Sequence, residues 1–189
     1  MDARTTAHLA VPEGTDLCVC FDYTDLDTPD AERWESYAQV RVVAWSMGVW
    51  AAAQVVPTLE LDIVQAVAVN GTPTPVDDRY GIPERIARGT CDNLTEQSFF
   101  KFMTRVSRGF KFIPESGLEA RKAELSRIIN ATTHAGQITW NRAIVSTQDA
   151  IFPPENLRNY WTGRCPVHEI EAPHYPFHLF KRWEELVNE

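Results

Sequence analysis

The sequence predicts an α/β fold in which helices cover both faces of a mostly parallel sheet. Its short apolar runs are mostly continuous rather than alternating, which is typical of strands buried on both faces. Helical patterns separate several of these runs, so strands and helices alternate along the chain. The runs occupy residues 16–22, 40–46, 64–71, 142–149 and 167–174.

Three helices are expected outside a longer helical insertion, at 47–56, 156–161 and 177–187. In the insertion, Asn93 precedes Glu96 by three residues at the head of an apolar stretch, which is a typical helix start. A second helical stretch closes near Gly136. We therefore expect one domain over residues 1–189, with a helical cap inserted at about 72–140.

Length and composition are those of a globular domain, since 189 residues can bury a sizeable core. The formal net charge of −8 argues against a nucleic-acid binder, which would carry a basic surface. No apolar run is long enough for a membrane span and the first residues have no signal-peptide layout, so we expect a cytoplasmic protein without a membrane partner. The cysteines lack the spacing of a zinc site, and we expect buried, reduced thiols at Cys18, Cys20, Cys91 and Cys165.

The most informative stretch is VRVVAWSMGVWAAAQVV, in which a β-branched strand runs straight into a helix with Ser46 at the junction. Ala44 and Gly48 flank it in the pattern of a nucleophile elbow, whose flanking residues must be small because the two backbones approach closely. The first N–H of the helix, on Met47, is suited to stabilise an oxyanion. A helix-capping serine would occupy the same place, but the buried strand before it and the small residues after it favour a nucleophile.

A serine nucleophile needs a base, and the base needs an acid that orients it. Asp149 ends the run at 142–149, and His174 ends the run at 167–174. Both are expected at the carboxyl edge of the sheet beside Ser46, where ligands bind in open α/β sheets. Each residue alone has an ordinary explanation, such as a turn aspartate. Together, in the order serine, acid, histidine, they favour the triad of an α/β-hydrolase.

Four stretches resemble the BioG family of pimeloyl-ACP methyl ester esterases, which are α/β-hydrolases of biotin synthesis. They are LCVCFDYTDLD, VRVVAWSMGVWAA, AVNGTPTPVDDRYGIP and APHYPFHLF, and the similarity spans nearly the whole chain. The last stretch also resembles the ending of the related BioH esterases. The resemblance implies that Ser46, Asp149 and His174 form the triad of an enzyme that hydrolyses the methyl ester of pimeloyl-ACP, releasing methanol and the free carboxylate. It implies no metal and no organic cofactor.

One departure from the family concerns the N-terminus. Family members begin with a strand that ends in a Gly-Trp-Gly type loop, which supplies a second oxyanion N–H. This sequence begins about where that loop should end, so the resemblance implies an N-terminally truncated α/β-hydrolase fold. The missing strand would lie between the runs at 16–22 and 40–46. Loss of one oxyanion donor typically costs about 10²–10³ in turnover, which leaves the activity of this chain open.

The first stretch of the cap has an apolar face and a basic face when drawn as a helix. The apolar face holds Phe99, Phe102, Met103, Val106 and Phe110, and the opposite face holds Lys101, Arg105 and Arg108. The resemblance implies that Phe99 and Phe102 cover the acyl chain, while the basic face meets the acidic helix of an acyl carrier protein. From the residues alone, an amphipathic helix with a solvated charged face explains the pattern equally well.

Trp45 and Asn70 are further candidates for lining the substrate pocket, although Asn70 could equally be a turn residue. Two other functions remain open. A general carboxylesterase or thioesterase would keep the triad without a basic cap. A non-catalytic module that binds an acyl carrier would need no serine nucleophile. We expect a monomer whose partner is the acyl carrier protein that bears the substrate.

Overall fold

The computed structural model describes residues 2–26, 34, 36–107, 116–131 and 138–188. Its centre is a parallel sheet in the order β1-β2-β3-β4. Four of the five predicted strands are therefore confirmed, and so is their parallel arrangement. They are β1 (Val40–Trp45), β2 (Ile63–Val69), β3 (Arg142–Ser146) and β4 (Val167–Ile170).

Both faces of the sheet are covered, as the continuous apolar runs require. Successive side chains of a strand point to opposite faces, so Ala68 packs in one core cluster while Val67 and Val69 pack in another. The first cluster includes residues from the helices α1 (Met47–Val55) and α5 (Pro154–Trp161). The second includes residues from the N-terminal segment, the short helix η4 (Phe177–Leu179) and α6 (Glu184–Val187). Two further short helices are η1 (Ala3–Thr6) and η3 (Val56–Thr58).

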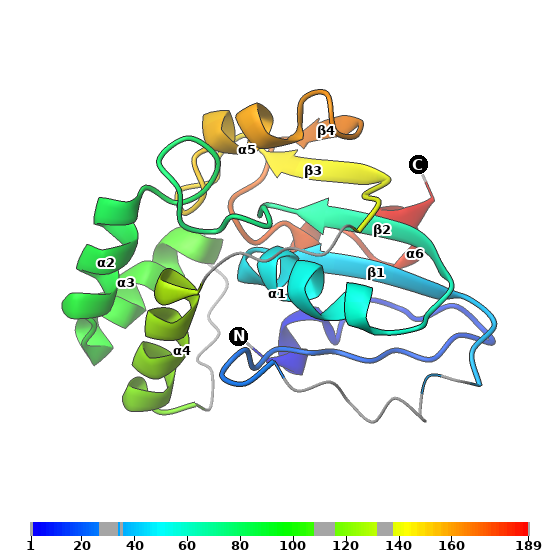
Figure 1. Ribbon diagram of the computed structural model, residues 1–189, viewed down its shortest axis with the longest axis horizontal. Helices are drawn as coiled ribbons and strands as arrows, with labels where there is room; N and C mark the ends of the chain where they lie inside the picture. Colours follow the sequence, from blue (N-terminus) through cyan, green and yellow to red (C-terminus); the bar gives the residue numbers. More distant parts are fainter. Residues whose placement is uncertain (1, 27–33, 35, 108–115, 132–137, 189) are drawn as a thin grey trace.

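Three helices lie within the predicted cap insertion: α2 (Glu84–Asp92), α3 (Glu96–Ser107) and α4 (Leu118–Asn130). Figure 1 shows them gathered at one end of the sheet, toward which the strand arrows point. The carboxyl ends of the strands therefore face these three helices. Gly136, the predicted end of the second cap helix, lies outside the described residues, and α4 itself ends at Asn130.

The prediction of a strand at 16–22 is wrong. These residues form no regular secondary structure and pair with no strand among the described residues, and Leu17 and Phe21 are each 45% exposed. An apolar run becomes a strand only when a neighbouring strand takes its backbone hydrogen bonds, and the run itself cannot supply one. The same exposure corrects the expectation for two thiols, since Cys18 and Cys20 are exposed, whereas Cys91 is buried.

The predicted helix at 177–187 is divided into η4 and α6. Between them, the N–H of Ala10 donates to the carbonyl of Lys181 at 2.8 Å, and the N–H of Trp183 donates to the carbonyl of Ala10 at 3.2 Å. These bonds to a distant segment replace helical ones, because a backbone group that pairs elsewhere cannot also continue the helix ladder.

The predicted helix start at Asn93 is two residues too early. Asn93 is the C-cap of α2, and its side-chain amide donates to the carbonyl of Gly89 at 2.8 Å. Thr95 and Ser98 instead exchange hydrogen bonds between side chain and backbone, with Ser98 in the capping-box position where glutamate or glutamine is usual. A short polar side chain can cap either end of a helix, and the sequence pattern alone does not separate the two.

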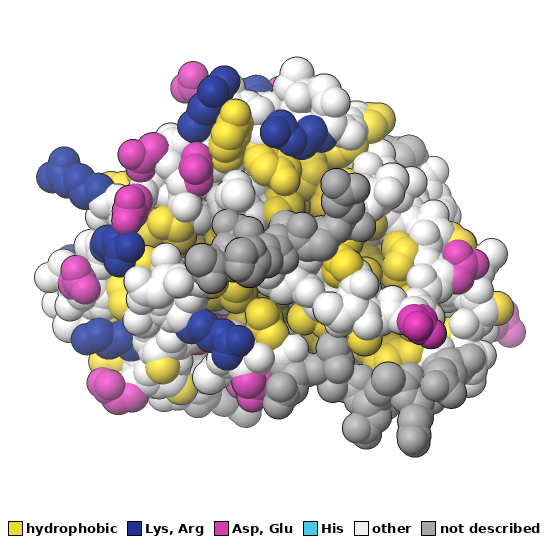
Figure 2. Space-filling view, viewed as in Figure 1, with side chains coloured by type: hydrophobic (Ala, Val, Ile, Leu, Met, Phe, Trp, Pro, Cys, Tyr) yellow, Lys and Arg dark blue, Asp and Glu magenta, His cyan; other side chains and the backbone are white. Residues whose placement is uncertain are grey.

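Charges of both signs are interspersed on the face shown in Figure 2. Arg88 and Glu84 form an ion pair on α2. Within the described ranges, no helix combines the length and apolarity needed to cross a membrane.

Candidate functional site

Ser46 lies in the sharp turn between β1 and α1, with a positive φ of 58°. Non-glycine residues rarely adopt this region of backbone space. The N–H of Ser46 donates to the carbonyl of Val69 at 2.9 Å. The side chain makes no capping hydrogen bond to α1, which rules out the N-cap explanation of this serine.

Gly71 explains how the turn fits against the neighbouring strand. A Cβ atom built on Gly71 would lie 2.9 Å from the carbonyl carbon of Ser46 and 2.9 Å from a methyl group of Val49, and closer still to the Ser46 carbonyl oxygen. These separations are shorter than ordinary contacts between carbon atoms. The chain after β2 therefore passes directly beneath Ser46, and only a residue without a side chain fits there.

The structure brings Ser46, His174 and Asp149 together in one chain of hydrogen bonds. Nε2 of His174 lies 2.8 Å from Oγ of Ser46, and Nδ1 lies 2.7 Å from Oδ2 of Asp149. The other carboxylate oxygen of Asp149 accepts the backbone N–H groups of Ile151 and Phe152 at 2.7 and 3.0 Å. His174 and Asp149 are 2% and 7% exposed. A nucleophile, a base and an orienting acid in this geometry can perform acyl transfer.

Two aromatic rings flank the imidazole of His174. Phe152 stacks on it with an interplanar angle of 7° and a centroid distance of 5.9 Å, and Trp45 lies against it at 5.3 Å. The carbonyl oxygen of His174 accepts two further hydrogen bonds, from the indole N–H of Trp45 and from the amide of Asn70, both at 2.9 Å. Packing and hydrogen bonding therefore fix both the ring and the backbone of this residue.

Trp45 and Asn70, which the sequence suggests as pocket residues, thus have defined partners in the structure. Asn70 is 1% exposed, and the second N–H of its amide donates to Oγ of Ser146 at 2.7 Å. With both amide protons used inside the protein, Asn70 does not present a free donor to a substrate. Trp45 is half-buried and remains beside the reacting atoms. Met47 is the first residue of α1, and the first N–H groups of a helix have no acceptor within the helix.

The apolar side of α3 packs toward this site. Met103 and Val106 are buried, and Phe102 packs against the core cluster that contains Tyr175 and Phe177. Phe99 is half-buried next to Phe102, with a ring separation of 6.2 Å. On the other side, Lys101 and Arg105 are exposed. Arg108 and Phe110 lie outside the described residues.

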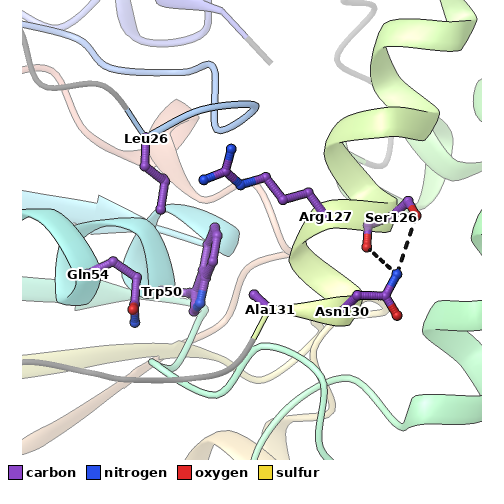
Figure 3. A pocket seen from close by; sticks show the side chains of 7 residues that line it. All are labelled: Leu26, Trp50, Gln54, Ser126, Arg127, Asn130 and Ala131. Atoms are coloured by element: carbon purple, nitrogen blue, oxygen red, sulfur yellow. Dashed lines mark hydrogen bonds between the residues drawn. The ribbon is translucent and has the colours of Figure 1, made fainter.

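A cavity of about 460 Å³ lies apart from this site, between α1 and α4 (Figure 3). Trp50 and Gln54 line it from α1, and Arg127 and Asn130 line it from α4. None of the three hydrogen-bonded residues contributes to it, so its size does not identify it as the place where chemistry occurs. Across the described ranges, no cluster of three or more His, Cys, Asp or Glu side chains is arranged to hold a metal ion.

Sequence reasoning missed Gly71 and Phe152 as parts of this site, and it missed Ser146 as the partner of the Asn70 amide. The Asn-Gly pair at 70–71 is a signal of a tight turn, but it does not reveal what the turn packs against. Ser146 and Phe152 carry no sequence signal of their own, since a serine at a strand end and an apolar residue after a turn are ordinary.

Comparison with known proteins gives a consistent result. The family model described as pimeloyl-ACP methyl esterase BioG matches residues 2–186. An uncharacterized protein of Haemophilus influenzae is 40% identical over 188 residues, which is 95% of this chain and 86% of that protein. A malonyl-[acyl-carrier protein] O-methyltransferase of Bacteroides fragilis is 38% identical over 181 residues, which is 90% of this chain but only 37% of that protein.

Solved structures agree with these sequence matches. The crystal structure of BioG from Haemophilus influenzae superimposes with a TM-score of 0.88 at 39% identity, covering 97% of this chain and 88% of that one. A pyrethroid hydrolase from Sphingobium faniae superimposes with a TM-score of 0.54, covering 78% of this chain and 68% of that one. At 13% identity, this similarity shows the fold alone.

Proposed function

The chain belongs to the BioG family, and from this premise we propose that it is a serine esterase that hydrolyses the methyl ester of pimeloyl-ACP. Ser46 is the nucleophile, His174 the base and Asp149 the orienting acid. The observation that carries the proposal is the unbroken hydrogen-bonded chain from Oγ of Ser46 through the imidazole to the carboxylate, with distances of 2.8 and 2.7 Å.

The proposed reaction is acyl transfer in two steps. His174 Nε2 accepts the proton of Ser46 as Oγ forms a bond to the ester carbonyl carbon. The negative charge that develops on the carbonyl oxygen is stabilised by the N–H of Met47 at the start of α1. The bond to the methoxy oxygen then breaks, and the imidazolium returns its proton so that methanol leaves. Water attacks the acyl-enzyme by the same route and releases the free carboxylate and Ser46.

Asp149 supports this cycle by holding one tautomer of the base. Its Oδ2 accepts a hydrogen bond from Nδ1–H, so the proton stays on Nδ1 and Nε2 is free to accept the serine proton. The two backbone N–H donors on Oδ1 fix the carboxylate in turn. This assignment needs no metal and no organic cofactor.

The cap supplies the proposed contacts to the rest of the substrate. Phe99 and Phe102 form an apolar side that would cover the acyl chain, beside Trp45. Lys101 and Arg105 are exposed on the opposite side of α3, and neither forms an ion pair with a carboxylate of the described residues. Two exposed cations on a protein with a net charge of −8 are suited to an acidic carrier protein.

The test is hydrolysis of methyl pimeloyl-ACP, measured by the mass of the carrier-bound product. We expect the wild-type protein to produce the free carboxylate, and Ser46→Ala to lose activity by about 10⁴-fold or more. Ser36→Ala, which alters an exposed serine, is the matched control and keeps the wild-type rate. If the Ser46 variant turns over as fast as the control, Ser46 is not the nucleophile and the proposal is wrong.

A further inference from the structure

The peptide group that joins His174 to Tyr175 is held at both of its polar atoms. Its carbonyl oxygen accepts the indole N–H of Trp45 and the amide N–H of Asn70, each at 2.9 Å. Its N–H donates to the carbonyl of Val106 at 2.9 Å. Residues at the ends of β1 and β2 thus bind the carbonyl of this peptide group, and a residue of α3 binds its N–H.

Asn70 is the member of this arrangement with the most constrained surroundings. One N–H of the amide donates to the His174 carbonyl and the other donates to Oγ of Ser146 at 2.7 Å. The amide oxygen Oδ1 accepts a hydrogen bond from the Ser146 N–H at 2.7 Å. All three polar positions of the amide are filled, and a flipped amide would place oxygen against the His174 carbonyl oxygen. Its backbone also has a positive φ of 47°, a region that asparagine tolerates better than most residues.

We propose that Asn70 is a positioning residue, which aims the imidazole of His174 at Ser46 by holding the backbone carbonyl of His174. The inference rests on the proposed function and assigns a role that the triad geometry alone does not supply. The hydrogen bond to Asp149 and the contacts with Phe152 and Trp45 orient the ring itself. The hold on the carbonyl fixes the backbone from which the ring extends toward Ser46. Shifts of about an ångström in a reacting group can cost about 10²-fold in rate.

The competing explanation is that Asn70 merely stabilises the core through Ser146. Two variants separate the roles. Asn70→Asp keeps an acceptor for the Ser146 N–H but replaces the donor to the His174 carbonyl with a repelling oxygen. Ser146→Ala removes the acceptor on Ser146 but leaves the Asn70–His174 bond in place. A core role predicts losses of stability while the folded fraction of both variants keeps a similar kcat. A positioning role predicts a much larger loss of kcat for Asn70→Asp.

The experiment measures kcat and KM for a short p-nitrophenyl ester, together with thermal unfolding. We expect Asn70→Asp to lower kcat by about 10–100-fold with KM changed less than about threefold, and Ser146→Ala to lower kcat by less than about threefold. Asn70→Gly, which accepts the positive φ without a side chain, should resemble Asn70→Asp. Equal losses for Asn70→Asp and Ser146→Ala, or wild-type kcat in both Asn70 variants, would overturn the inference.

Trp45→Phe provides a second route if the Asn70 variants fail to fold. It keeps an aromatic ring but removes the other donor to the same carbonyl, so kcat should fall in the same way; an unchanged kcat contradicts the role of the carbonyl.

A spectroscopic readout is independent of turnover. The Nδ1 proton resonance of His174 should shift or broaden in Asn70→Asp and stay in place in Ser146→Ala. If the wild-type protein shows no Ser46-dependent hydrolysis, the proposed function fails, while an unmoved resonance in Asn70→Asp refutes the positioning role itself.

Discussion

Gly71→Ala tests whether the serine turn is held in place by the close passage of the chain after β2. The new methyl group would lie 2.9 Å from both the Ser46 carbonyl carbon and a Val49 methyl, and closer still to the Ser46 oxygen. Carbon atoms in contact prefer about 3.5–4.0 Å. The backbone of Ser46 must therefore withdraw by at least about half an ångström, which moves Oγ relative to the imidazole.

The expected consequence is a loss of rate with retention of the fold. A displacement of this size in a reacting group corresponds to about 10–100-fold in kcat, and overpacking of a tight site costs about 1–3 kcal/mol, less than the stability of a typical domain. Hydrolysis of a p-nitrophenyl ester and urea unfolding measure the two effects. Gly89→Ala is the matched control, because a Cβ there meets nothing within 4 Å and alanine favours a helix.

We expect Gly89→Ala to keep the wild-type rate and to unfold at slightly higher urea. If Gly71→Ala also keeps the wild-type rate, the elbow does not depend on this contact and the account of how Ser46 is positioned is wrong.

Three other predictions concern Asp149 in the site, the exposed cations of α3 and the carboxylate of Glu124 on α4. Asp149→Asn should lower kcat about 10⁴-fold through the wrong imidazole tautomer, measured on a small ester, and a loss below about tenfold would contradict the role of the acid. Combined Lys101→Glu and Arg105→Glu should raise KM for methyl pimeloyl-ACP but not for a small ester. As a control, charge reversal of two basic residues on α2 and α4 should leave both KM values unchanged. Equal effects of the two double variants on KM for methyl pimeloyl-ACP would exclude α3 as the docking surface. Burial raises the pKa of Glu124, whose carboxylate accepts the N–H of Tyr23 at 3.0 Å. The folded state then holds this proton more tightly than the unfolded state, so stability relative to Glu124→Gln should fall as pH rises above about 4.3, the ordinary pKa of glutamate. Urea unfolding measures this difference, and a constant difference would contradict the shift.

The features that could be predicted from the sequence are those that local patterning determines. The run at 142–149 holds a fully buried parallel strand because both faces of the sheet are covered, and the run at 40–46 holds a partly buried strand at the sheet edge. Small residues around Ser46 marked the turn, and the chain order of acid and histidine placed both beside it. These signals depend on periodicity, residue size and strand direction, all of which the sequence carries directly.

The remaining features depend on partners that are distant in the sequence. The run at 16–22 has the composition of a strand but has no paired neighbour in the described part of the chain. The final helix is divided because Ala10 binds the backbone at residues 181–183. Asn70 was suggested as a pocket residue, and only the fold reveals that Ser146 and the His174 carbonyl take up its amide protons.

The central claim is that an imidazole at residue 174 activates the hydroxyl at residue 46, and covalent labelling with a fluorophosphonate tests it most directly. The account predicts a single adduct that maps to Ser46, and a labelling rate that falls by about 10³-fold or more in His174→Ala while the protein remains folded. An adduct on another residue, or an undiminished rate in the His174 variant, would contradict it.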